Sequence, residues 1–135
     1  MNDYAEGLIT GAVTARTLAE HFKKCETDRQ VLAPLTAHII LDEYAFFELE
    51  GKRAGWIVLH PAESVDLRKF ARDMIDFESQ KYFLDQGIVG SLYGVYIVLD
   101  RTLDAGTVIL LAAGLDAPSA CVDSKVLGRV IRVRR

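Results

Sequence analysis

The pattern of apolar and polar positions is clearest between residues 56 and 74. The apolar run 56–59 is rich in residues that favour β-structure and is typical of a central strand. Pro61 has no amide hydrogen to donate to a sheet, so this strand is expected to end at His60. Over 63–74, apolar residues recur at helical spacing among charged ones. This pattern predicts a strand followed by an amphipathic helix.

Glycines mark the next part of the chain, at positions 87, 90 and 94, ahead of the apolar run 95–99. The run predicts a strand, and the glycines predict a turn that joins it to a preceding strand. Gly90 or Gly94 is expected to occupy a left-handed or tightly packed backbone position, because glycine tolerates both.

The remaining pattern gives a coarse plan of one domain over residues 1–135. Gly7 and Gly11, on the first helix, leave a surface of small residues where another backbone could approach. The expected elements are a helix from Asn2 or Asp3 to about Lys24, a helix capped by Thr36 and ending near Gly51, a stretch at 76–86 that is irregular or forms a short turn of helix, a strand at 108–111, and a strand at 126–133 with a bulge or bend at Gly128. Helices first and strands later predict an α+β fold, with a mainly antiparallel sheet flanked by helices.

This order of elements resembles the major capsid proteins of tailed bacteriophages, whose Hong Kong 97-type shell fold is shared with encapsulins. The resemblance covers roughly residues 35–110. The residues that carry it are His60-Pro61, Leu67-Arg68-Lys69, Gly87, Gly90, Gly94, the strand 95–99, and the helix over 35–47. Family members usually carry an extended N-terminal arm, a long β-hairpin loop and a longer backbone helix. With 135 residues, this chain would be a reduced or truncated form of the capsid-type fold.

Composition fits a folded domain of ordinary type. The 15.0 kDa chain is 50% hydrophobic and 26% charged, whereas a disordered chain would be poorer in large apolar residues. No apolar run approaches the roughly 18 residues that span a bilayer, and no secretory signal is visible at the N-terminus. A location in the cytoplasm or in a virion is therefore expected, with no membrane partner.

Charge is unevenly distributed. Residues 1–100 carry 10 Lys or Arg against 16 Asp or Glu, whereas residues 101–135 carry 6 against 3. An acidic body argues against sequence-specific binding of nucleic acid. The basic end is predicted to contact acidic residues of an adjoining subunit; contact with phosphate and a solvated strand end are the alternatives. The predicted contact residues are Arg129, Arg132, Arg134 and Arg135.

Metal or cofactor binding is not predicted. Cys25 and Cys121 lie far apart and are expected to be free thiols. His21 and Cys25 share a helix face at spacing i and i+4, which is half of a metal site, but no second pair completes it.

Catalytic motifs are also absent, so no catalytic residue and no enzyme activity are predicted. Gly87–Gly94 is neither a dinucleotide-binding loop nor a P-loop, and Ser91 does not lie in a nucleophile elbow. His60 and Asp100 each follow a strand, where a general base can stand. A hydrolase that uses His60 is accordingly the least favoured hypothesis.

The resemblance implies a structural, self-assembling shell subunit that forms a homo-oligomer, with other capsid components as further partners. The alternative is a small oligomeric accessory or binding protein of viral origin that shares the fold.

Overall fold

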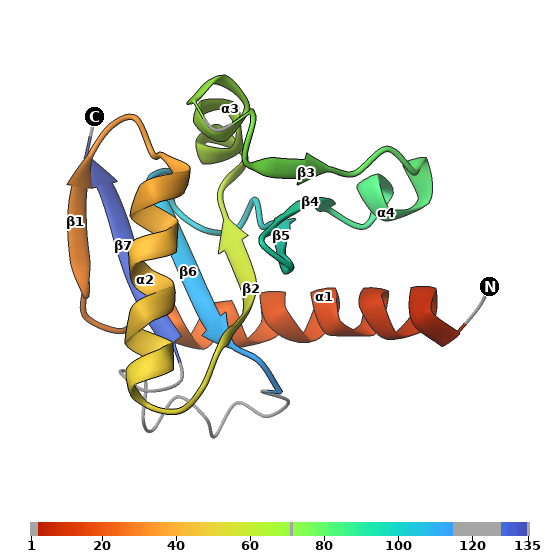
Figure 1. Cartoon of the computed structure of the whole chain (residues 1–135), viewed down its shortest axis with the longest axis horizontal. Coiled ribbons are helices and arrows are strands. Elements are labelled where there is room, and N and C mark those ends of the chain that lie inside the picture. Colours follow the sequence, from red (N-terminus) through yellow and green to blue (C-terminus); the bar gives the residue numbers. More distant parts are fainter. Residues whose placement is uncertain (1–2, 71, 115–127, 135) are drawn as a thin grey trace.

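The computed structural model describes residues 3–70, 72–114 and 128–134, and within them seven strands form one mixed sheet with helices on both faces (Figure 1). The sheet order is β1-β7-β6-β2-β5-β4-β3. The helices are α1 (Asp3–Phe22), α2 (Ala37–Leu49), α3 (Pro61–Phe70) and α4 (Lys81–Asp85), and the strands are β1 (Arg29–Leu32), β2 (Ala54–Leu59), β3 (Ile75–Phe77), β4 (Ile88–Leu92), β5 (Val95–Leu99), β6 (Thr107–Ala112) and β7 (Gly128–Arg134).

Four strand pairs are antiparallel, and two, β1 with β7 and β2 with β5, are parallel. The predicted α+β class with a mainly antiparallel sheet is therefore confirmed in this coarse form. Strand β1 was not predicted, and it adds a parallel edge next to β7. The capsid-type fold itself stays a prediction.

Both faces of the sheet are buried, which explains its runs of consecutive apolar residues. Ile57 and Leu59 of β2 pack in the same cluster as Ile40 and Phe47 of α2. Val58, between them, points to the opposite face and packs in the cluster of α1. All six residues of β6 are buried, as expected for a strand covered on both sides.

The second helix is capped as predicted. Thr36 has an extended backbone, and its hydroxyl accepts a hydrogen bond from the amide of Ile39 at 3.4 Å. The third helix differs from the prediction of 63–74, because it begins at Pro61 and ends at Phe70. Proline suits the first helical turn, where its missing amide hydrogen costs no hydrogen bond. The stretch 76–86 contains part of β3 and the short helix α4.

The β4–β5 hairpin closes through a two-residue turn, Tyr93-Gly94, with φ of 47° and 83°. Positive φ at both central residues is the type I′ arrangement, whose twist matches the flanking strands. Gly94 therefore occupies the left-handed position that was predicted. Gly90 is tightly packed, because a Cβ there would lie 2.6 Å from the carbonyl oxygen of Asp76.

The predicted bulge or bend at Gly128 falls at the first described residue of β7. Over its described residues, β7 pairs with β6 without a register shift. The glycine makes room for Phe22 of α1, because a Cβ at position 128 would lie 2.5 Å from that ring. Residues 126 and 127 of the predicted strand lie outside the described residues.

Candidate functional site

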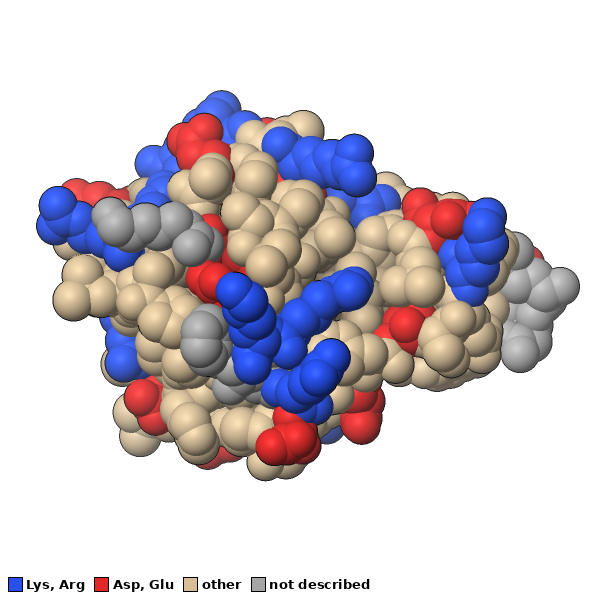
Figure 2. All heavy atoms as spheres, turned by 90° about the horizontal axis from the view of Figure 1, so that it is seen from above, with Lys and Arg blue, Asp and Glu red and all other residues tan. Residues whose placement is uncertain are grey.

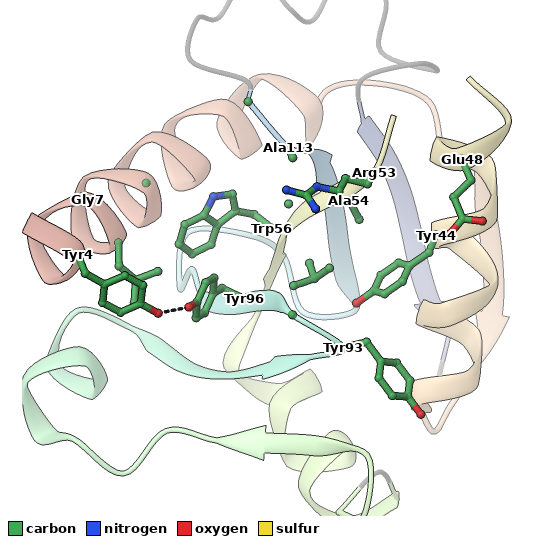
Figure 3. Close-up of a pocket in the computed structure, with 16 residues that line it drawn as sticks. Tyr4, Gly7, Tyr44, Glu48, Arg53, Ala54, Trp56, Tyr93, Tyr96 and Ala113 are labelled. Atoms are coloured by element: carbon green, nitrogen blue, oxygen red, sulfur yellow. Dashed lines mark hydrogen bonds between the residues drawn. The ribbon is translucent and has the colours of Figure 1, made fainter. Parts of the chain in front are cut away.

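An open groove of about 690 Å³ lies between the N-terminal half of α1, the C-terminal half of α2, strand β2 and the β4–β5 hairpin (Figure 3). Its walls carry five aromatic side chains, from four helices or strands and one turn, and two charged side chains stand among them. The aromatic residues are Tyr4, Tyr44, Trp56, Tyr93 and Tyr96, and the charged ones are Glu48 and Arg53.

Three of the aromatic residues form one connected group. The rings of Trp56 and Tyr96 lie 5.6 Å apart between centroids at an interplanar angle of 36°, a tilted contact. The hydroxyl groups of Tyr4 and Tyr96 share a hydrogen bond, which joins the first turn of α1 to β5 (Figure 3). That bond, together with burial, raises the pKa of Tyr96 to about 12, because both favour the neutral phenol.

Small residues let these elements approach. A Cβ at Gly11 would lie 2.7 Å from the Trp56 ring, and a Cβ at Gly55 would lie 2.7 Å from Cα of Ala113. Gly7 has no atom within 4 Å of its own Cβ position. Of the predicted small-residue surface, Gly11 thus seats an aromatic ring and Gly7 faces open space.

Tyr44 and Tyr93, two tyrosines that lie near each other at the α2 side of the groove, differ in how tightly they are held (Figure 3). The hydroxyl of Tyr44 donates to the carbonyl oxygen of Leu92 at 2.9 Å, and burial raises the pKa of Tyr44. Tyr93, in the hairpin turn, is 67% exposed and is held at the rim by its backbone. Tyr44 is therefore fixed by its hydrogen bond, whereas the ring of Tyr93 is exposed at the rim of the groove.

The charged residues of the groove are exposed. Glu48 comes from the last turn of α2, and Arg53 precedes β2. Among the described residues, neither side chain has an ion-pair or hydrogen-bond partner. Both charges are available to a molecule that enters the groove.

Beyond the groove, the structure brings His60 and Asp100 together at the ends of the parallel strands β2 and β5. The amide of Asp100 donates to the carbonyl oxygen of Leu59 at 2.9 Å. The side chains serve their own turns: Nδ1 of His60 accepts from the amide of Ala62 at 3.0 Å, and Oδ1 of Asp100 accepts from the amide of Thr102 at 2.9 Å. This geometry explains both residues as helix and turn caps.

Two of the four arginines predicted to contact another subunit are held within the chain. Nε of Arg129 lies 2.7 Å from the buried carboxylate of Glu43, and its guanidinium group stacks on Phe46 at 3.8 Å. Arg132 donates to the hydroxyl of Thr107 at 2.6 Å and to the carbonyl oxygen of Lys23 at 2.9 Å.

Of the other two arginines, Arg134 is exposed, and Arg135 lies outside the described residues. On the face shown in Figure 2, Lys and Arg side chains stand among Asp and Glu. Contact of the basic end with another subunit stays a prediction, and Arg134 is the described residue that is placed to make it.

The His21–Cys25 pair, on α1 and the turn that follows it, makes one weak contact, which involves the backbone of His21 and not its imidazole ring. Sγ of Cys25 lies 3.8 Å from the carbonyl oxygen of His21. No cluster of three or more His, Cys, Asp or Glu side chains suited to a metal occurs over 3–70, 72–114 and 128–134. Cys25 is a free thiol, and Cys121 lies outside this part of the chain.

Sequence reasoning did not predict the groove, because its aromatic residues are spread over residues 4–96. The one local signal is the Tyr93-Gly94 pair, in which tyrosine stands where a type I′ turn favours asparagine or glycine.

None of the helices in the described ranges is both long enough and apolar enough to span a membrane. Comparison with protein-family models, with curated proteins and with solved structures finds no match for this chain.

Proposed function

We propose that this protein is a structural, self-associating subunit, of the kind that builds phage-type shells, and that the aromatic groove is one of its contacts with further copies. The observation that carries the proposal is the conformation of Tyr93. This residue combines a positive φ of 47° with a side chain that is 67% exposed.

A left-handed backbone costs a residue with a Cβ about 1–2 kcal/mol, and asparagine tolerates it better than tyrosine does. The tyrosine is therefore a poor choice for the turn itself. Its ring contributes little to the core, since most of it faces solvent. A residue that is unfavourable for folding and exposed at the rim of a groove is best explained by contact with another molecule.

The make-up of the groove supports a protein as that molecule. Tyrosine, tryptophan and arginine are the residues most enriched at the energetic centres of protein interfaces. Besides Tyr93, Tyr4 is 63% exposed at the groove, and Leu49, next to Glu48, is 83% exposed. Exposed apolar surface of this kind, with charged residues at its edge, marks sites of association.

The resemblance to capsid proteins supports self-association in particular. The elements that carry it are present in order: β2 ends before Pro61, α3 follows, and the β4–β5 hairpin leads into the strand 95–99. Shell subunits work through many modest contacts that symmetry repeats, so each contact can be weak while the assembly is stable.

Sedimentation velocity on the wild type and on Tyr93→Asn, over a hundredfold range of concentration, tests this function. We expect the wild type to form larger species as concentration rises. Tyr93→Asn is expected to shift the population toward the monomer while its melting temperature stays equal or rises, because the turn is relieved. Tyr82→Asn is the control, since Tyr82 is an exposed tyrosine of α4 away from the groove.

A wild type that stays monomeric at every concentration would contradict self-association. Assembly of Tyr93→Asn at wild-type concentrations would show that the groove is not a contact surface.

A further inference from the structure

Two residues of opposite charge, Glu48 and Arg53, line the groove together with its aromatic residues. Glu48 lies on the α2 side, whereas Arg53 extends over the groove from the segment before β2 (Figure 3). The two have opposite charge and lie in the same lining, yet among the described residues they do not pair with each other.

A surface that carries an acidic and a basic residue at separate positions can be complementary to a second copy of itself that is rotated by a half turn. A two-fold axis that passes midway between two such residues, perpendicular to the line that joins them, places the acid of each copy opposite the base of the other. A partner of strong single-signed charge would instead be met by a groove of the opposite sign.

We propose that the groove forms a two-fold symmetric contact between two copies of this chain, in which Glu48 of each copy pairs with Arg53 of the other. The inference rests on the proposed self-association and adds to it the symmetry, the register and the first step of assembly. That first step is a closed dimer whose aromatic surfaces face each other.

The ion pairs set the register more than they set the affinity. Charges at the rim of an interface add little when they are matched, but juxtaposed like charges oppose association strongly. Reversing one member of the pair therefore has a larger effect than removing it. Under two-fold symmetry a single reversal creates two like-charge contacts in each dimer.

Charge reversal gives the test, with dissociation constants measured by sedimentation velocity. Glu48→Arg alone and Arg53→Glu alone are each expected to weaken the wild-type dimer at least about tenfold. An equimolar mixture of the two variants is expected to form a 1:1 heterodimer of near wild-type affinity, because every contact in it joins Arg to Glu. The double variant on one chain is expected to recover self-association.

Two neighbouring residues serve as matched controls. Glu50→Arg and Lys52→Glu make the same changes of charge at exposed positions that do not line the groove. Each is expected to change the dissociation constant less than about threefold, in line with the small effects of surface charges.

Failure of this inference differs from failure of the proposed function. If Tyr93→Asn weakens association while both reversals at the groove act like their controls, the groove is a contact but the pairing is wrong. Mixed variants that stay apart, or that assemble only into species larger than a dimer, also overturn the two-fold contact. A wild type that is monomeric throughout overturns both.

Discussion

Replacing Glu43 with glutamine should destabilise the fold strongly, because this carboxylate is the centre of a buried ionic network. Its side chain is 0% exposed and contacts two guanidinium groups, with Oε1 at 3.3 Å from Arg29 and Oε2 at 2.7 Å from Arg129. The network joins three elements, since Arg29 lies in β1, Glu43 in α2 and Arg129 in β7.

The size of the effect depends on the ion pairs that Arg29 and Arg129 retain after Glu43 is replaced. Removing one partner of a buried ion pair costs about 3–5 kcal/mol. The loss here should lie near the lower end, because Arg29 is 33% exposed and keeps Asp42 at 3.5 Å, while Arg129 keeps Asp28 at 3.6 Å. We therefore expect the free energy of unfolding to fall by about 3 kcal/mol for Glu43→Gln.

Urea unfolding followed by tryptophan fluorescence measures this loss, because Trp56 is the single tryptophan of the chain. With a slope of about 2 kcal/mol per molar urea, the midpoint should fall by about 1.5 M. Glu48→Gln, on the same helix but exposed, is the control and should change stability by less than about 0.5 kcal/mol at concentrations where the chain is monomeric. Equal midpoints for Glu43→Gln and the wild type would refute the reasoning.

Three further predictions concern the hairpin, the aromatic group and the basic strand. Tyr4→Phe should lower the pKa of Tyr96 from about 12 toward the ordinary value near 10, seen as tyrosinate absorbance in an alkaline titration. Because the raised pKa stabilises the fold below pH 10 and this stability is lost as pH rises to about 12, the wild type should lose more stability over that window than the variant does. Gly94→Val should lower the free energy of unfolding by about 1–3 kcal/mol in thermal melts, and an unchanged melting temperature would show that the turn does not need glycine. Arg132→Ala should cost about 1–3 kcal/mol, because it removes hydrogen bonds to Thr107 and Lys23, whereas exposed Arg134→Ala should stay within about 0.5 kcal/mol; equal losses would mean that the contacts of Arg132 contribute nothing.

The elements that could be predicted from the sequence are those whose signal is local. The cap at Thr36, the apolar run of β2 and the left-handed Gly94 each depend on neighbouring residues, and each was placed correctly. The end of α3 was predicted four residues too late, because the helical spacing continues to Met74 although the chain turns toward edge strand β3.

Features that depend on distant residues could not be predicted. Strand β1 has only four residues, and its partner β7 comes late in the sequence. Arg129 stands in a basic segment that suggests an exposed surface, but the buried Glu43 of α2 turns its guanidinium group inward. The groove is of the same kind, since no short segment contains more than a part of it.

The position of β2 at the centre of the sheet has a consequence for the order in which the chain folds. On one side, β5, β4 and β3 all come from residues 75–99, so short loops join them and little chain entropy is lost when they pair. On the other side, Asp28 and Val130, which are 102 positions apart, must meet before β1 can lie against β7. We therefore expect the β3–β4–β5 meander to form early and the β1 edge to close last. During synthesis on the ribosome, β1 waits without its partner until β7 has been made, and its length of four residues leaves little unpaired strand to aggregate in that interval.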